Sequence, residues 1–402
     1  MATTVLSTFA VLKDHVKLKI NENSVAIDNI VFRLHYRATF LALLVSCLLV
    51  TSRQFVGEHI KCIADNAIRS DVINTFCFFT STYTVVKHLN ITSIELGDIP
   101  HPGIGPATKN DPVIHHAYYQ WVPFVLFFQA ILFYIPHYLW KKIEGGRLKV
   151  LVSGLQMASL SLNEKEIVTG NVKVPSRKDR DERIQKIRTA FINRLHINRP
   201  WAYYMGLCEL LNLTNVLMQI YITNAFLGGS FLDLGTSVTE NHSGEVDPLD
   251  VIFPKVTKCI FHKYGASGGI QRHDALCVMA LNIINEKIYT FLWFWFIIVA
   301  VVTALGLLWR ILTMLLHARS TAFNKFVFSM ACPGKHNPWT VLTVTHEYYF
   351  GDWLFLYYIA KNLDNYVFKE LLQNLAHDLE ERRLQRVRVD PNDEDEPLTK
   401  KD

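Results

Sequence analysis

Cysteine is the residue type in this 402-residue sequence that most directly suggests a chemistry. The chain has seven cysteines, and four of them fall in two polar stretches: Cys62 and Cys77 in the first, Cys259 and Cys277 in the second. An even set of cysteines in an oxidising compartment forms disulfides, and four cysteines allow three pairings. Spacing alone does not choose among these pairings. The remaining cysteines are Cys47, Cys208 and Cys332.

Zinc binding is a second chemistry open to the same region. Cys259, His262, His273 and Cys277 have a spacing that could hold a zinc ion. Free thiolates are rare outside the cell, however, and the two cysteines of the other stretch also need partners. We therefore favour disulfides over zinc and expect no metal and no cofactor.

The sequence shows none of the enzyme motifs that we searched for, although it contains 16 histidines. His115-His116 is the only adjacent histidine pair, and the sequence lacks repeated HxxxH boxes, HExxH, GxSxG and the P-loop. The net charge of +5 is small and dispersed, which argues against nucleic acid as a partner. We expect neither an enzyme nor a nucleic-acid-binding protein.

Membrane-spanning helices are the elements that must position these residues. The chain is 50% hydrophobic and only 19% charged, whereas soluble domains carry about 25% charged residues. Four apolar stretches are long enough to cross a bilayer, and polar loops flank each one, which argues against buried helices of a soluble core. The predicted spans are residues 32–53, 113–140, 201–227 and 289–317. The predicted fold is an all-α membrane protein with disulfide-linked outer loops, which leave room for some β structure, and a mostly helical cytoplasmic dome.

The distribution of positive charge predicts the orientation of the spans. Of the 41 Lys and Arg residues, 31 lie in the two terminal tails and the loop between the second and third spans. Positive residues resist translocation, so these segments are predicted to be cytoplasmic. The even set of cysteines then lies outside, where disulfides form. No cleavable signal peptide is recognised, so the first span is expected to stay in the protein as an anchor. The predicted segments between the spans are a cytoplasmic N-terminal helix at 1–31, extracellular loops at 54–112 and 228–288, a cytoplasmic loop at 141–200 and a cytoplasmic C-terminal region at 318–402, with about the last 12 residues disordered.

A polar face is predicted inside the third span. Glu209 is its one acidic residue, and an intramembrane carboxylate suggests a functional role. Asn212, Asn215 and Gln219 follow at steps of three and four residues, so they share one helix face with Glu209. This face either lines water or bonds to a neighbouring helix.

Two amphipathic helices are predicted outside the membrane. Arg177 to His196 carries an apolar stripe surrounded by basic residues, which suits either anionic lipid or packing within the protein's own dome, and we favour the dome. The N-terminal stripe could enter a pore or lie on the membrane. Its residues are Val5, Phe9, Leu12 and Val16.

Two glycosylation sequons fall in the predicted outer loops, at Asn90 and Asn241. A third, at Asn212, lies inside a span and should remain unused. A glycan at either outer position would oppose head-to-head docking there, because it is bulky.

The start of the second span carries a family signature. It reads Tyr118, Tyr119, Gln120, Trp121 and Val122. This resembles the YYQWV signature of innexins, the invertebrate gap-junction proteins. Asp28-Asn29 before the first span, Gly351-Asp352-Trp353 and Lys361-Asn362-Leu363 also resemble the family. The resemblance runs from about residue 25 to 370, and its general form is insect-like.

The resemblance implies a large-pore channel subunit at the plasma membrane. Innexin subunits form a ring, commonly of eight, and two such hemichannels dock through their outer loops to join adjacent cells. The expected partners are further copies or other innexins, the docking hemichannel and membrane lipids. The family's crosswise disulfides imply the pairs Cys62–Cys277 and Cys77–Cys259. The pore path would include the N-terminal stripe and residues from about Ala38 to Lys61, with Arg53 among the candidates, and would pass ions and small metabolites with weak selectivity.

Two alternatives remain open at this point. One is an unpaired, pannexin-like hemichannel that releases small molecules. The other is a four-helix adhesion protein without a pore, although such proteins concentrate their cysteines in one loop. Conductance between paired cells would distinguish the gap-junction channel from both alternatives.

Overall fold

The structure is a computed structural model of the whole chain. It describes residues 25–56, 60–64, 68–89, 101–108, 110–152, 155, 167–169, 172–174, 176–193, 198–239, 248–332 and 349–389. The chain divides into two compact units. The membrane unit comprises Asp28–Lys142 and Tyr204–Leu312, and the terminal unit comprises Met1–Ile27, Ile143–Tyr203 and Thr313–Asp402.

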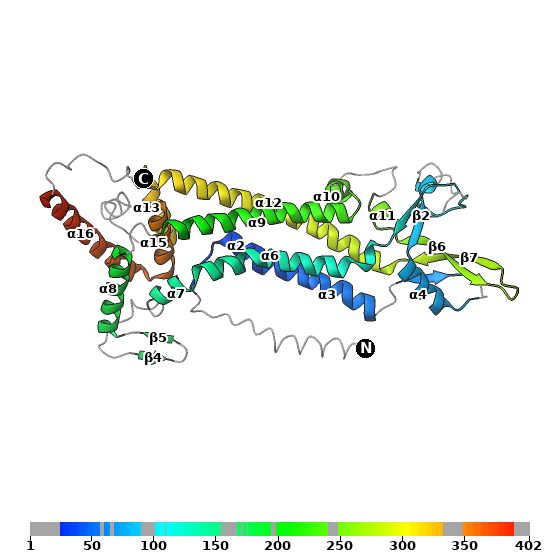
Figure 1. Ribbon diagram of the computed structural model, residues 1–402, viewed down its shortest axis with the longest axis horizontal. Coiled ribbons are helices and arrows are strands. Elements are labelled where there is room, and N and C mark those ends of the chain that lie inside the picture. The colour runs from blue at the N-terminus through cyan, green and yellow to red at the C-terminus, as the bar shows by residue number, and fades with distance from the viewer. Residues whose placement is uncertain are drawn as a thin grey trace. The chain divides into compact units, whose positions relative to one another are not determined.

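Four long apolar helices cross most of the membrane unit, side by side (Figure 1). The first is a composite of α2 (Ile30–Arg33), the π-helical turn η1 (Leu34–Thr39) and α3 (Phe40–Val56). The others are α6 (Val122–Glu144), α9 (Arg199–Phe226) and α12 (Ala280–Leu316). Each is long and apolar enough to span a bilayer, so the four-helix membrane fold is confirmed.

The π-helical turn interrupts the first span within the segment that resembles innexins. The Thr39 hydroxyl donates to the carbonyl of Leu34, five residues earlier, at 3.0 Å. His35 and Thr303 of α12 share a buried hydrogen bond of 2.8 Å. Single π-helical turns concentrate at functional sites because they re-aim side chains. Here the turn directs His35 toward α12.

The prediction that the second span starts at residue 113 is wrong. Val113–His116 forms strand β3 and Tyr118–Gln120 forms the 3-10 turn η3, so α6 begins only at Val122. Strand β3 pairs antiparallel with β2 (Thr82–Val85), a partner about 30 residues earlier in the chain. That pairing leaves no local signal in the sequence.

The fourth helix is longer than predicted and begins nine residues before the expected position 289. Its first turns carry polar residues that read as loop in the sequence. The structure buries them: the Asn282 side chain donates to the carbonyl of Pro254 at 2.9 Å, and Glu286 lies 3.6 Å from the Lys255 ammonium. The polar turns therefore anchor α12 to the outer loop.

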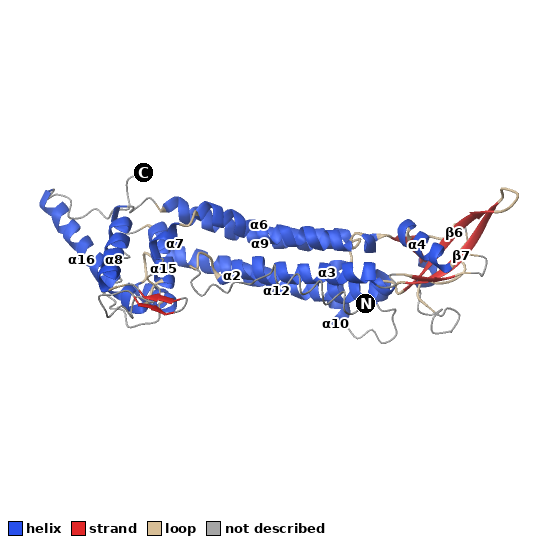
Figure 2. Cartoon of the chain, turned by 90° about the horizontal axis from the view of Figure 1, so that it is seen from below, coloured by secondary structure: helices blue, strands red, loops and turns tan. Residues whose placement is uncertain are grey.

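A five-stranded sheet lies at one end of the four helices (Figures 1 and 2). Its order is β1-β7-β6-β2-β3, so the two strands of the second outer loop lie between strands of the first. The long hairpin of β6 (Val256–Tyr264) and β7 (Ile270–Val278) forms its centre, with β1 (Lys61–Ile63) at one edge. Three short helices complete this part: α4 (Ser70–Thr80), α10 (Phe231–Thr239) and α11 (Pro248–Ile252), with the 3-10 turn η2 at Val86–Leu89.

The terminal unit is mostly helical, as expected. It contains α7 (Arg147–Val152), the hairpin β4 (Ile167–Thr169) and β5 (Val172–Val174), α8 (Arg177–Asn193), α13 (Thr321–Ala331), α15 (Phe350–Asn362) and α16 (Asn365–Val389). The amphipathic helix α8 buries Ile184, Ile187 and Phe191, and Arg188 forms an ion pair with Asp378 of α16. Packing within its own unit therefore accounts for the apolar stripe of α8.

Several predicted features lie outside the described residues. They are the N-terminal stripe of Val5, Phe9, Leu12 and Val16, the sequons at Asn90 and Asn241, and the expected disordered tail beyond 389.

Candidate functional site

Two disulfides join the two outer loops. Cys62 of β1 and Cys277 of β7 are direct partners across the antiparallel pair, with Cα atoms 3.9 Å apart, and are bonded. Cys77 of α4 is bonded to Cys259 of β6, with Cα atoms 5.9 Å apart. These are the crosswise pairs that the resemblance implied. They connect segments 215 and 182 residues apart, so the loops cannot separate.

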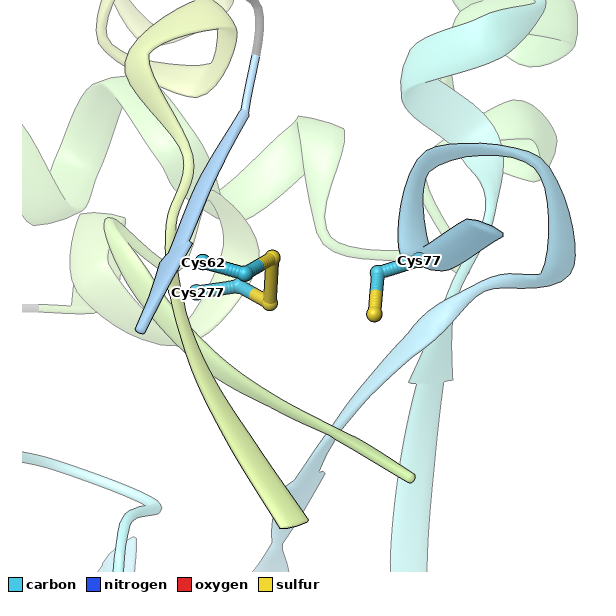
Figure 3. A group of neighbouring side chains, drawn as sticks. All are labelled: Cys62, Cys77 and Cys277. Atoms are coloured by element: carbon cyan, nitrogen blue, oxygen red, sulfur yellow. A yellow bond between two sulfur atoms is a disulfide. The ribbon is translucent and has the colours of Figure 1, made fainter. Parts of the chain in front are cut away.

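The zinc alternative fails on this geometry. The sulfur atoms of Cys62, Cys77 and Cys277 lie within 4.8 Å of one another, close enough to suggest a metal site (Figure 3). All of them are consumed by disulfide bonds, as is Cys259. Zinc requires thiolates, so the cluster is a pair of adjacent cross-links.

The family signature holds one of these cross-links in place. The Tyr119 hydroxyl donates to the carbonyl of Phe78 at 3.2 Å, and the Gln120 amide donates to the same carbonyl at 2.5 Å. That carbonyl follows Cys77, near the end of α4. The Tyr118 hydroxyl donates to the carbonyl of Ile252 in the second loop at 3.2 Å. The signature therefore ties the start of α6 to both loops, while Val122 is buried and Trp121 is 60% exposed.

Burial keeps both signature phenols neutral. Desolvation raises the pKa of Tyr119 to about 12 and the pKa of Tyr118 well above its usual value. Both hydroxyls consequently remain donors at every physiological pH. The hydrogen bonds that Tyr118 and Tyr119 donate to the outer loops should therefore not depend on pH.

A buried histidine lies in the same sheet. His116 of β3 shares a hydrogen bond of 2.8 Å with Thr84 of β2 and is 4% exposed. Desolvation, with a smaller contribution from His115, lowers its pKa from 6.5 to about 4. The neutral ring is therefore the form that the folded sheet accepts.

Acid should destabilise the β2–β3 edge of the sheet. Because the folded pKa of His116 is depressed, its contribution is complete above pH 6.5 and is lost as the pH falls toward 4, by up to about 3 kcal/mol. We expect the protection factors of the β2 and β3 amides, which correct for the intrinsic pH dependence of exchange, to fall over this range. His116→Gln should flatten that pH dependence, whereas His115→Gln, at the exposed neighbouring position, should keep it. Equal pH profiles for all three proteins would contradict the assignment.

A second polar centre lies between the long helices. Glu209 of α9 is 5% exposed, and both its oxygens accept from Arg310 of α12, at 2.6 and 2.9 Å. The Asn29 side-chain amide donates to the same carboxylate at 2.7 Å, while its oxygen caps α2 by accepting from the Phe32 amide at 2.9 Å. The ion pair thus holds the start of the first span against α9 and α12.

Asp28 anchors the same point to the remaining long helix. Its carboxylate lies 3.1 Å from Arg33 and 3.5 Å from a ring nitrogen of His137 in α6. Adjacent residues at the start of α2 therefore contact α6 and α9 directly, and the Glu209–Arg310 pair extends this link to α12. Sequence reasoning placed Glu209 on a polar face but missed its partner Arg310. A basic residue at the matching depth of an antiparallel helix was the available signal.

The remaining predicted site residues are not gathered at one place. Asn212, Asn215 and Gln219 are buried on the face of α9 that Glu209 begins. Arg53 is exposed in the last turn of α3, and Lys61 is exposed on β1.

Comparison with known proteins decides the family. The sequence model of the Innexin family matches residues 28–379. Innexin inx7 of Drosophila melanogaster is 50% identical over 375 residues, which cover 92% of this chain and 84% of that protein. Innexin inx2 of Schistocerca americana is 43% identical over 377 residues, covering 92% and 98%. Innexin inx2 of Drosophila melanogaster is 42% identical over 375 residues, covering 90% and 93%.

The chain belongs to the innexin family. Innexins are gap-junction channel subunits of the plasma membrane, so the predicted family, the channel fold and the gap-junction function are confirmed. The innexin carries its cross-linked sheet at one end of the long helices.

The GDW segment of this innexin packs without spare room. Asp352 is buried and accepts from Asn198 at 2.9 Å, and the Trp353 ring nitrogen donates to Asn324 at 2.8 Å. A Cβ atom added to Gly351 would lie 2.7 Å from the carbonyl oxygen of Asn198. That oxygen belongs to the backbone and cannot rotate away.

Gly351→Ala should therefore destabilise the terminal unit by about 1–3 kcal/mol, the usual cost of overpacking. Limited proteolysis of the purified channel measures this as faster cleavage within residues 349–389. Gly146→Ala is unsuitable as a control because its φ is +77°. Gly206→Ala, where a Cβ atom meets nothing within 4 Å, should leave the cleavage rate unchanged. A Gly351→Ala protein that resists protease as the wild type does would refute the packing argument.

Proposed function

We propose that this innexin forms a ring of eight subunits with both termini in the cytoplasm, and that the ring docks through its disulfide-linked sheet. The observation that carries the proposal is the sheet itself, in which strands of the first outer loop flank the hairpin of the second on both sides and two disulfides join the loops. A rigid surface loses little conformational entropy on association. Such a surface suits contact between two identical rings.

The orientation rests on charge and on the disulfides together. Of the 41 basic residues, 31 lie in the two terminal tails and in the segment between α6 and α9. Positive segments stay in the cytoplasm, and disulfides persist outside it. The positive charges and the disulfides both support a sheet outside the cell and chain termini in the cytoplasm.

The pore assignment follows from the exposure of the first span. Leu41, Leu48 and Leu49 of α3 are between 45% and 58% exposed, so α3 presents an open face that the subunit does not cover itself. Arg53 and Lys61 extend this side toward the outer loop with exposed positive side chains. We assign α3, the N-terminal segment and these two residues to the pore path, and the exposed apolar faces of the other long helices to neighbouring subunits and lipid. A wide path of this kind keeps ions hydrated and selects weakly.

Paired-cell recording tests the function. Two cells that both express the chain should show conductance between them and should exchange small dyes, and the purified particle should appear as a double-layered ring of eight. Conductance in single cells without coupling would instead indicate an unpaired hemichannel. Neither current nor ring-shaped particles would indicate an adhesion protein.

A further inference from the structure

The interior of a single subunit contains a row of amide side chains that contacts among the described residues do not satisfy. We define the amide row as Asn212, Asn215 and Gln219 of α9 with Gln129 of α6. These side chains are 1%, 5%, 0% and 2% exposed. From Asn212 to Thr223, which binds Gln129, the row extends about 17 Å along α9, more than half of a ~30 Å hydrocarbon core.

Each amide has bonding capacity left over. The Gln219 amide nitrogen donates to Asn215 at 3.2 Å, and the Gln129 nitrogen donates to the Thr223 hydroxyl at 2.8 Å. Five buried atoms have no hydrogen-bond partner among the described residues: Nδ2 and Oδ1 of Asn212, Nδ2 of Asn215, Oε1 of Gln219 and Oε1 of Gln129. Leaving such atoms unpaired costs about 1–3 kcal/mol each. A row of five would be a large penalty for one helix bundle.

Neither lipid nor a neighbouring subunit can supply the missing partners. The five atoms are fully buried within one subunit, so nothing at its surface reaches them. The partner must be small enough to occupy the bundle interior. A bound water fits that description and commonly satisfies about three buried polar groups.

The chemistry of the five atoms selects water over an ion. Three are acceptors and two are donors. A cation would leave the donors unpaired and an anion would leave the acceptors unpaired, whereas water donates and accepts. The only carboxylate on this face, Glu209, is already neutralised by Arg310.

Further unpaired atoms continue the row toward the sheet. Asn285 and Tyr289 of α12 are one turn apart, both 0% exposed, and the Asn285 amide and the Tyr289 hydroxyl have no partner among the described residues. The Tyr289 ring lies 6.4 Å from that of Phe226, at the end of α9 that follows Thr223. The polar interior therefore extends from near the Glu209–Arg310 pair to the outer end of α12.

We propose that each subunit binds a row of water molecules along the amide row, inside its own helix bundle and separate from the pore of the ring. The waters would satisfy the buried amides of α6 and α9 through exchangeable hydrogen bonds. The row crosses most of the membrane without a net charge, so it is a site for water and not a path for ions.

The first test is a map of the assembled channel in lipid nanodiscs at a resolution that shows ordered water. We expect density within hydrogen-bond distance of the five atoms. An empty interior, or amides turned to bond directly to protein groups, would overturn the proposal. The result is independent of the number of subunits and of docking, so failure of the proposed function leaves this test valid.

The second test uses radiolytic hydroxyl labelling, in which X-rays split bound water into hydroxyl radicals that oxidise the side chains beside it. Cys208 is 3% exposed and lies one turn from Asn212 on the same face of α9. We expect oxidation of Cys208 in the wild type and its loss in Asn212→Leu, while Thr214→Val, on the exposed side of α9, retains it. Cys332, 1% exposed and 2.7 Å from the Asn365 side chain, is the buried reference.

The proposal also predicts the direction in which the thermal stability of these variants changes. Since only water satisfies Asn212, Asn212→Leu should leave the thermal midpoint unchanged or raise it, and Gln219→Met provides a second, volume-matched replacement. Equal Cys208 oxidation in wild type and Asn212→Leu would refute the proposal. So would a large drop of the midpoint in Asn212→Leu, because it would reveal direct protein partners of Asn212, whereas Gln219→Met also removes the hydrogen bond to Asn215.

Discussion

We expect Cys77→Ser to abolish conductance between paired cells. Cys77 and Cys259 join α4 to the central hairpin, and their bond closes a loop of about 180 residues. Removing a native disulfide of this kind costs about 2–5 kcal/mol. The effect concentrates on the outer loops, whose strands belong to distant segments and depend on the cross-links for their register. A docking surface without that register cannot match its partner across the intercellular gap.

The measurement is dual voltage clamp of cell pairs, together with surface labelling to count channels at the membrane. Cys259→Ser and the double variant should lose coupling equally, because each removes the same bond. Cys47→Ser provides the matched control, since the free thiol of Cys47 faces α6, where it donates to the carbonyl of Pro123 at 3.4 Å, and not the exposed leucine face assigned to the pore. Normal coupling by Cys77→Ser, at equal surface expression, would disprove the docking role of the cross-link.

Arg310→Met should destabilise the membrane unit by about 3–5 kcal/mol. The substitution leaves the Glu209 carboxylate buried between helices with Asn29 as its remaining donor. An uncompensated charge in this position is costly, whereas a pair of apolar side chains of similar volume is tolerated. The expected order of stability is therefore wild type close to the double variant Glu209→Met/Arg310→Met, with Arg310→Met well below both.

Thermal unfolding in detergent measures this order, with the loss of the assembled particle as the signal that is monitored. Arg53→Met serves as the matched control because Arg53 is exposed, and its midpoint should stay near that of the wild type. If the losses of stability in Glu209→Met and Arg310→Met simply add in the double variant, Glu209 and Arg310 do not interact.

The sequence was sufficient wherever the signal was local and periodic. A run of some 20 apolar residues has only one favourable conformation in lipid, a helix, because every backbone group must bond within the segment. The third span could therefore be predicted to within two residues of Arg199–Phe226. The same argument failed where polar residues are buried by tertiary contacts, as in the first turns of α12, where Asn282 bonds to Pro254.

What the sequence determined by itself is the number of membrane spans, the preference for disulfides over a metal, and the family, because length, charge and a contiguous signature are written along the chain. Only the tertiary structure decided that Val113–His116 is a strand, that Arg310 partners Glu209, and that four amides form a buried row. These features depend on which distant segments meet. Such meetings follow from packing of the whole bundle and sheet, and no window of neighbouring residues encodes them.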